Sequence, residues 1–309
     1  MFGSRILTIV PLFAVSVISE RIPVDSALTD TLTRYAWFAS AAYSSNCNIP
    51  PFNTTIEKKF HHVITDTQAT LFRDDLHAEY ILAFRGTSSP WDIITDLRRS
   101  LVDCTSALPS CTNCTCHKGF LGQYLAVKEE IEPYLTFILQ DTAYSLTATG
   151  HSMGASGASI LATALKSQGL SLNAYSYGQP RTGNTAYAAY VDSMFPLTSE
   201  SQETDKLLRV THANDGIPQV PSQKRGYRHH STEIWIPPTG DEVYRCIGQE
   251  PADCNALLPG YPLNSPHFSY LGVSIGNPLD RNAACKGPNL SVDWEGIISE
   301  DSSWEDADR

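Results

Sequence analysis

Apolar and polar positions along the chain follow two alternating patterns. Short apolar runs predict strands, and apolar residues spaced three or four positions apart predict helices. The expected strands are residues 80–84, 145–149, 172–177, 207–211 and 233–236, and the expected helices are 30–44, 120–139 with a break near Pro133, about 155–168, and 186–194. Strands that alternate with helices predict an α/β fold whose mainly parallel sheet is covered by helices on both faces.

Both ends of the chain depart from this pattern. Residues 1–19 combine Arg5, an apolar run over residues 6–17 and compact residues before position 19, which is typical of a secretory signal peptide. Residues 291–309 form an acidic tail with few apolar residues, and we expect this tail to be solvated and disordered. Residues 20–290 remain as one α/β domain, which is long enough to bury one large core.

Composition argues against some partners and favours one compartment. The 309 residues carry a formal net charge of −11 without a cluster of Lys and Arg, which argues against nucleic-acid binding. After residue 20, no segment is apolar over the length that a transmembrane helix needs. We therefore expect a soluble protein that is secreted to the extracellular space, with a monomer as the default oligomeric state. Sequons at Asn53, Asn113 and Asn289 are candidate glycosylation sites on that route.

The chain contains eight cysteines, an even number that favours disulfides in an oxidising compartment. Cys111, Cys114, Cys116 and His117 lie close enough in sequence to suggest a zinc site. A second Cys/His pair at a suitable spacing is missing, so we expect disulfides and no metal. The cysteine spacing by itself leaves the connectivity open.

The segment Gly150-His151-Ser152-Met153-Gly154 lies between an expected strand and an expected helix. A Gly-x-Ser-x-Gly in that setting is typical of a nucleophile elbow, a strained turn that presents a serine hydroxyl above the sheet. The alternative is an ordinary Gly/Ser turn, because the bare pattern occurs by chance in many proteins. The flanking strand and helix favour the elbow.

A nucleophilic serine needs a histidine to take its proton and a carboxylate to orient that histidine. In α/β-hydrolase folds the acid and then the histidine follow the serine along the chain. Asp215 is the best candidate acid after Ser152, since it comes just past the expected strand 207–211. The alternative is a turn without a catalytic role, because Asn214-Asp215-Gly216 has turn-forming residues.

The candidate base is His267, on a loop before a closing apolar stretch. His229 and His230 also follow Asp215, but they precede a strand and are more typical of surface or turn residues. His151 lies inside the elbow and is expected to point away from where a base must stand. His212 is expected to be a packed, hydrogen-bonded core histidine.

Acyl transfer also needs hydrogen-bond donors for the oxyanion that develops in the transition state. The backbone N–H of Met153, directly after the serine, is one candidate. The second is Thr87, which follows the expected strand 80–84 and offers its N–H and its hydroxyl.

The residues after Thr87 predict an amphipathic helix, with Ser89 as its cap and Pro90 at its first position. An ordinary surface helix would have this pattern. The alternative is a lid, because this helix directly follows the oxyanion candidate Thr87. Such a lid covers the serine in water and exposes apolar surface on meeting lipid. The expected lid residues are Trp91, Ile93, Ile94, Asp96 and Leu97.

An ordered series of further motifs supports a family resemblance: Phe84-Arg85-Gly86-Thr87, His117-Lys118-Gly119-Phe120, the elbow, Tyr177-Gly178-Gln179-Pro180-Arg181-Thr182-Gly183-Asn184, Arg209-Val210-Thr211-His212-Ala213-Asn214-Asp215, Gly226-Tyr227 with His229, and Pro266-His267. The chain resembles the class 3 family of fungal and yeast triacylglycerol lipases, whose relatives include fungal feruloyl esterases. The likeness runs from about residue 30 to residue 285.

This resemblance implies an α/β-hydrolase fold with a helical lid, in which residues 20–290 are the catalytic domain. It makes Ser152 the nucleophile, Asp215 the acid and His267 the base, with Thr87 and Met153 as oxyanion positions and Asp96 supporting Thr87. It also implies the disulfides Cys47–Cys285, Cys111–Cys114 and Cys246–Cys254, which leaves Cys104–Cys116 as the fourth pair. No metal or organic cofactor is needed for this chemistry.

The expected function is that of a secreted serine esterase of the lipase type, which hydrolyses acylglycerol esters at a lipid–water interface. A feruloyl esterase is the alternative enzyme, and the apolar residues Ile93, Ile94 and Leu97 favour lipid over it. A non-catalytic lipid- or wall-binding protein is the alternative of another class, and the complete triad argues against it. The chain departs from the family at Met153, where leucine is usual, and in a cysteine-rich insertion over residues 104–116.

Overall fold

A nine-stranded sheet runs through the described part of the chain. The computed structural model describes residues 21–87, 100–140, 142–196, 206–240, 242–261, 263–279 and 282–285. The expected signal peptide (1–19), the acidic tail (291–309), the lid residues Trp91, Ile93, Ile94, Asp96 and Leu97, and the sequon at Asn289 lie outside these ranges.

The strands of this sheet, in spatial order, are β1 (Arg21–Pro23), β13 (Tyr244–Cys246), β12 (Glu233–Ile236), β10 (Leu207–His212), β8 (Asn173–Tyr177), β7 (Ser145–His151), β4 (Glu79–Phe84), β3 (Thr67–Asp74) and β2 (Thr55–His62). The central strands β12, β10, β8, β7 and β4 are parallel. The strands outside them pair in antiparallel fashion. The fold class predicted from the sequence, α/β with a mainly parallel central sheet, is confirmed.

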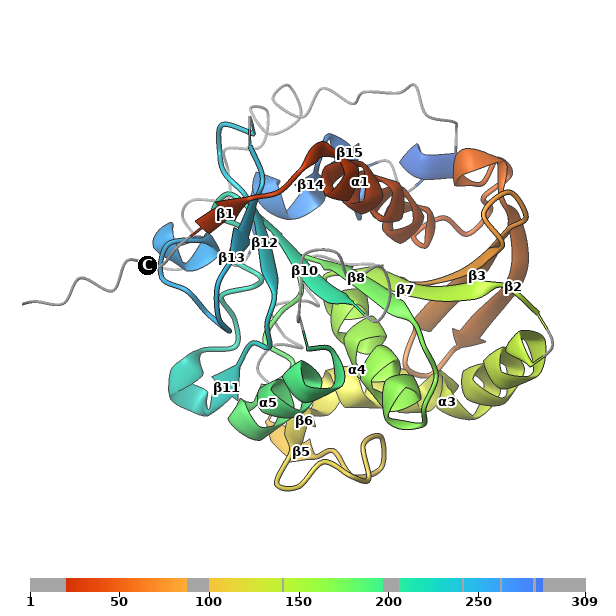
Figure 1. The fold of residues 1–309 in the computed structure, drawn as a ribbon, viewed down its shortest axis with the longest axis horizontal. Helices are drawn as coiled ribbons and strands as arrows, with labels where there is room; N and C mark the ends of the chain where they lie inside the picture. Colours follow the sequence, from red (N-terminus) through yellow and green to blue (C-terminus); the bar gives the residue numbers. More distant parts are fainter. Residues whose placement is uncertain are drawn as a thin grey trace, which may run out of the picture.

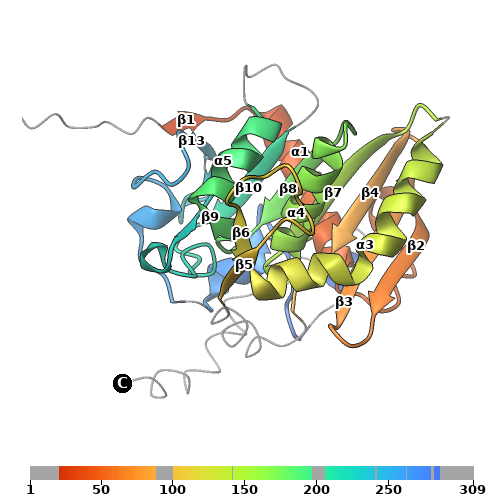
Figure 2. The same ribbon diagram turned by 90° about the horizontal axis from the view of Figure 1, so that it is seen from below.

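Helices cover both faces of the sheet. They are α1 (Ser26–Ala41), α3 (Lys118–Leu139), α4 (Met153–Ser167) and α5 (Thr185–Met194). Helix α1 lies on one face, and α3, α4 and α5 lie on the other (Figure 1). Figure 2 looks onto the second face, where α4 crosses in front of the central strands. No helix among the described residues is long and apolar enough to cross a membrane.

The sheet divides the core into two layers. Along β4 the side chains alternate, so that Leu82 and Phe84 join the core beneath α3 and α4, whereas Ile81 and Ala83 join the core beneath α1. Every residue of β4 is buried, which explains why this strand appears in the sequence as a continuous apolar run.

Two helices differ from their predicted extents. Asp25 accepts a hydrogen bond from the Leu28 N–H at 2.7 Å, so α1 begins four residues before the expected start at residue 30. The predicted break of α3 at Pro133 is wrong, because the helix continues to Leu139. Pro133 removes one backbone donor, but Ile131 and Leu135 on either side are buried in the same core and hold the helix together.

A four-stranded sheet and a two-stranded sheet complete the fold. The first contains β11 (Tyr227–Arg228), β9 (Gly183–Asn184), β6 (Thr115–His117) and β5 (Leu101–Asp103), and the second contains β14 (Ser269–Tyr270) and β15 (Val273–Ser274). Four disulfides join Cys47 to Cys285, Cys104 to Cys116, Cys111 to Cys114 and Cys246 to Cys254. This is the pairing that the family resemblance implied. The side chains of Asn53 and Asn113 are exposed.

The parallel strands position the candidate site. Their carboxyl ends meet at one edge of the sheet, which is where open α/β sheets bind ligands. Thr87 follows β4, Ser152 follows β7 and Asp215 follows β10. All three therefore lie at the same edge.

Candidate active site

Ser152 lies in a strained turn between β7 and α4, with φ 57° and ψ −128°. A non-glycine residue rarely adopts a positive φ. The turn is possible because two glycines leave room for it. A Cβ on Gly150 would lie 2.5 Å from the Gly154 carbonyl oxygen, and one on Gly154 would lie 2.5 Å from the Phe84 carbonyl oxygen. This is the geometry of a nucleophile elbow.

Asp215 and His267 form a buried pair. The His267 Nδ1 lies 3.0 Å and 3.1 Å from the two carboxylate oxygens of Asp215, and neither residue is exposed to solvent. His267 belongs to a short 3₁₀ turn, Ser265–Phe268, and Asp215 to the loop after β10. The Ile217 N–H donates to Asp215 Oδ1 at 2.9 Å, which orients the carboxylate. An aspartate in this position fixes the tautomer of the histidine, with the proton on Nδ1.

Tyr270 is a further partner of Asp215 that sequence reasoning missed. Its hydroxyl donates to Asp215 Oδ2. Burial and the neighbouring Asp215 carboxylate raise the pKa of Tyr270 well above its usual value, so the hydroxyl stays protonated and remains a donor. The sequence shows only that Tyr270 follows His267 by three residues; in the structure it lies in β14, directly after the 3₁₀ turn of His267.

The nucleophile and the base are close but not hydrogen-bonded. Among the described residues, Ser152 Oγ and His267 Nε2 are both buried and both lack a partner. Both residues contact the segment Tyr177-Gly178: the Ser152 N–H donates to the carbonyl of Tyr177 at 2.9 Å, and a Cβ on Gly178 would lie 3.0 Å from His267 Cε1. Nucleophile–base hydrogen bonds are often long in the absence of substrate and tighten when it binds.

The two candidate oxyanion residues lie side by side. Thr87 Oγ1 is 3.7 Å from Met153 Sδ. Met153 is the first residue of α4, where backbone N–H groups have no acceptor within the helix and the helix dipole is positive. Gly86, the residue before Thr87, packs against the elbow. A Cβ on Gly86 would lie 2.7 Å from the His151 carbonyl oxygen.

The prediction that His229 and His230 are surface residues is wrong, because both are buried. The His229 Nε2 donates to the Pro218 carbonyl at 2.7 Å. Burial and nearby arginines lower the pKa of His229 well below its usual value, and burial and Arg209 lower that of His230 to about 3. Both histidines are therefore neutral structural groups. His212 is partly buried, and its Nδ1 bonds the Ser269 carbonyl at 2.6 Å.

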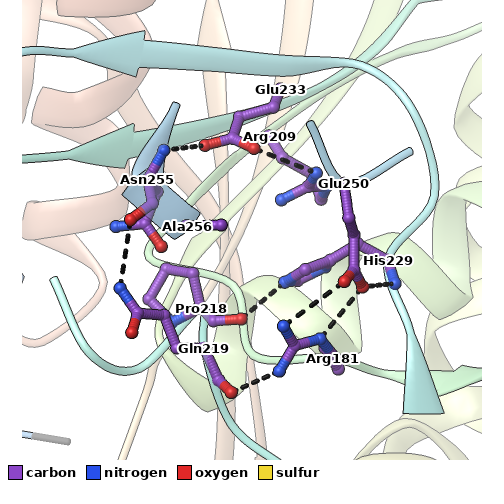
Figure 3. A pocket seen from close by; sticks show the side chains of 9 residues that line it. All are labelled: Arg181, Arg209, Pro218, Gln219, His229, Glu233, Glu250, Asn255 and Ala256. Atoms are coloured by element: carbon purple, nitrogen blue, oxygen red, sulfur yellow. Dashed lines mark hydrogen bonds and ion pairs between the residues drawn. The ribbon is translucent and has the colours of Figure 1, made fainter. Parts of the chain in front are cut away.

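An ionic cluster holds the far end of the Asp215 loop (Figure 3). Arg181 bonds both carboxylate oxygens of Glu250, at 2.9 Å and 3.3 Å. The same guanidinium donates to the backbone carbonyls of Gln219 and Pro221, which continue the loop. The cavity between these side chains has a volume of about 20 Å³, which is enough for a water molecule and too small for an ester. This cluster orders the loop and is not a substrate site.

Known proteins with similar sequences or folds are lipases. The model of the family "Lipase (class 3)" matches residues 81–225. The secreted mono- and diacylglycerol lipase 2 of Gibberella zeae is 33% identical over 202 residues, which are 57% of this chain and 49% of that protein. The lipase of Rhizomucor miehei is 31% identical over 230 residues, 72% of this chain and 60% of that protein. The chain spans about half the length of the first curated relatives it matches.

Solved lipase structures are similar over most of the described fold. The lipase of Rhizopus microsporus var. chinensis has a TM-score of 0.73 at 27% identity and covers 84% of this chain and 92% of its own. A triacylglycerol lipase whose catalytic centre is a serine protease triad also has a TM-score of 0.73, at 27% identity, over 84% of this chain and all of its own. These likenesses and the topology make the fold that of an α/β hydrolase. The chain is similar to the class 3 lipase family.

Gly178→Ala should damage the candidate site. Its φ of +57° is unfavourable for alanine, and the new Cβ would lie 2.5 Å from Tyr270 Oη and 3.0 Å from Asp215 Oδ2. Since a misplacement of about 1 Å costs about 100-fold in rate, we expect a loss of that order in the hydrolysis of p-nitrophenyl butyrate. Gly169→Ala is the matched control, because Gly169 also has a positive φ but open space around it. Equal rates for both variants would contradict this expectation.

Stability should fall as the pH drops below about 6.5. Folding lowers the pKa values of His151, His229 and His230, so the unfolded chain binds more protons at acidic pH. For His230 the stabilisation is lost between the unfolded value of 6.5 and the folded value of about 3. Each histidine contributes up to about 1.4 kcal/mol per pH unit in this window. Urea unfolding at pH 7 and pH 5 measures the difference in the free energy of unfolding. His230→Gln should reduce this difference. Equal free energies of unfolding of the wild-type protein at both pH values would refute the prediction.

Proposed function

We propose that this protein is a secreted serine hydrolase that cleaves acylglycerol esters through an acyl-enzyme on Ser152, with residues 20–290 as its catalytic domain. One observation carries the proposal: the buried Asp215–His267 pair lies beside a serine on a strained elbow. Three side chains with complementary roles, at the carboxyl edge of a parallel sheet, have the arrangement that acyl transfer requires.

In the proposed reaction, His267 Nε2 accepts the proton of Ser152 as Oγ attacks the ester carbonyl. The charge moves to the carbonyl oxygen, where the Met153 N–H and Thr87 donate hydrogen bonds. Collapse of this intermediate breaks the ester bond, and His267 returns its proton to the departing alcohol. A water molecule then attacks the acyl-enzyme while His267 accepts its proton. Collapse of the second intermediate returns that proton to Ser152 Oγ and releases the carboxylic acid. The Asp215 carboxylate stabilises the imidazolium.

Tyr270 helps to orient Asp215 in this scheme. Its hydroxyl donates a hydrogen bond to Asp215 Oδ2. The imidazolium of His267 therefore forms next to a negative charge that three neighbours hold in place: Ile217, Tyr270 and His267 itself.

Several observations support secretion and an acylglycerol substrate. The relatives in Gibberella zeae and Penicillium camembertii are named secreted mono- and diacylglycerol lipases. Four disulfides suit an oxidising compartment, as do the signal-like residues 1–19 and the exposed sequon residues Asn53 and Asn113. The chemistry needs no metal or organic cofactor, and an amphipathic lid over Trp91 to Leu97, with Asp96 supporting Thr87, remains part of the proposal.

A lipid surface as partner is supported by exposed apolar side chains near the site. Val63 and Ile64 are 78% and 91% exposed, in the turn between β2 and β3. Because β3 is antiparallel to β4, this turn lies at the same edge of the sheet as Ser152. The ion pair between Arg85 and Asp66, at 2.6 Å, ties the turn to the segment that precedes Thr87. Contact between this turn and a lipid surface would therefore bring that surface close to the site.

Comparing three substrates tests the function. We expect the highest rates on emulsified diacylglycerol or triacylglycerol, lower rates on soluble short-chain ester, and little turnover of methyl ferulate. Ser152→Ala should lower each rate by about 10⁴-fold or more, because the covalent route is lost. Strong activity on methyl ferulate without activity on acylglycerol would instead identify a feruloyl esterase. Normal turnover by Ser152→Ala would place the nucleophile elsewhere.

Replacing the exposed turn residues tests the lipid contact. The double variant Val63→Ser, Ile64→Ser should bind emulsion about 100-fold more weakly, because each buried apolar side chain contributes about 1.5 kcal/mol. Its rate on soluble ester should not change. Leu76→Ser is the matched control, since Leu76 is 86% exposed in the β3–β4 turn at the opposite end of the sheet. Equal emulsion binding by the double variant and Leu76→Ser would refute the contact at this turn.

A further inference from the structure

His151, the residue directly before the proposed nucleophile, makes two hydrogen bonds that the reaction scheme does not use. Its Nε2 lies 2.7 Å from the backbone carbonyl of His267, and its Nδ1 lies 2.8 Å from the hydroxyl of Tyr43. The ring is 1% exposed, and its centroid is 4.5 Å from that of the His267 ring. The sequence predicts that His151 points away from the position of the base, but its ring lies against His267 and reaches the backbone of that residue.

The partners allow one protonation state of His151. A carbonyl oxygen only accepts hydrogen bonds, so Nε2 must carry the proton. Nδ1 is then an acceptor, and the hydroxyl of Tyr43 must donate to it. Burial and the neighbouring His267 lower the pKa of His151 well below its usual value, so the ring remains neutral. It therefore adds no positive charge next to His267 when that residue becomes an imidazolium.

The surrounding backbone leaves space for this pair of side chains. A Cβ on Gly86 would lie 2.1 Å from Tyr43 Oη. A Cβ on Gly276, where φ is +70°, would lie 2.9 Å from Tyr43 Cζ and 3.1 Å from His151 Nδ1. Gly86 belongs to the segment that ends at Thr87. Tyr43 thus packs where the oxyanion segment, the elbow and the loop of the base meet.

We propose that His151 and Tyr43 are a positioning pair that holds the backbone of His267 in register with Ser152. The proposal rests on the proposed function, because it assigns His267 as the base. His267 comes from a four-residue 3₁₀ turn, 115 residues along the chain from Ser152, so the two elements have no secondary structure in common. The bond from His151 links them through a single side chain next to the nucleophile.

This link explains why both ends of the His267 residue are held. The imidazole is fixed through Nδ1 by Asp215, and the backbone is fixed through its carbonyl by His151. Losing the second contact leaves the ring free to pivot about the Asp215 bond. Nε2 then moves relative to Ser152 Oγ, which slows proton transfer without altering how the ester binds.

The test compares three variants with the wild-type protein. His151→Leu removes the donor and should lower kcat for a soluble ester by about 10- to 100-fold, with KM changed less than about twofold. Tyr43→Phe removes only the hydroxyl that fixes the tautomer, and a smaller loss of about three- to tenfold is expected. His151→Gln keeps an N–H donor near the position of Nε2 and should restore most of the lost kcat.

Tyr187→Phe is the matched control for Tyr43→Phe. Tyr187 is also buried, and its hydroxyl contacts Ser159 at 3.1 Å, beneath α4 and away from the site. Tyr187→Phe should lower the free energy of unfolding in urea about as much as Tyr43→Phe does, while its kcat stays equal to that of the wild-type protein. If His151→Leu fails to fold, Tyr43→Phe and His151→Gln still decide the question. A kcat for Tyr43→Phe equal to that of Tyr187→Phe, or no difference between His151→Leu and wild type, would overturn the proposal.

A second measurement does not depend on ester hydrolysis. The Nδ1 proton of His267 in its bond to Asp215 gives a low-field NMR resonance that His267→Ala removes. This resonance should shift or broaden in His151→Leu and return in His151→Gln. If the wild-type protein hydrolyses no ester, the proposed function fails, and the resonance still tests the pair. If wild type is active and the resonance and kcat are unchanged in His151→Leu, only the positioning role fails.

Discussion

The close approach of α4 to β4 is the constraint on which the site depends. The helix begins so near the strands that neither Gly150 nor Gly154 could carry a Cβ, and Ser152 is held at a positive φ as a result. That geometry places the serine side chain and the first N–H groups of α4 on the same side of the sheet edge. The nucleophile and one oxyanion donor are therefore positioned by a single backbone turn.

The acid and the base depend on a different kind of support. Both lie on loops, where few backbone hydrogen bonds fix the chain, and side chains supply the missing restraint. Asn255 donates to the Asp215 carbonyl at 2.9 Å, and His229 to that of Pro218 at 2.7 Å. Arg181 holds the end of the same loop while paired with Glu250. These buried side-chain contacts supply the restraint that the loop backbone lacks.

Much of the central fold could be predicted from the sequence, for physical reasons that are local. Strand β4 is buried on both faces and so appears as an apolar run, and the elbow needs glycines at fixed positions. The edge strand β2 was not predicted, because its exposed face carries Glu57, Lys59 and His61 and breaks the apolar run. The contacts of Tyr270, His229 and His230 could not be predicted either, since they join residues far apart in sequence.

The central claim is that Ser152 is an activated nucleophile, and covalent labelling tests it most directly. A fluorophosphonate should modify the folded protein at one site, and mass spectrometry of the digested protein should place the phosphonyl group on Ser152. Unfolded protein should not react, because the serine then lacks its base. Modification of another residue, or no modification of the folded protein, would contradict the account.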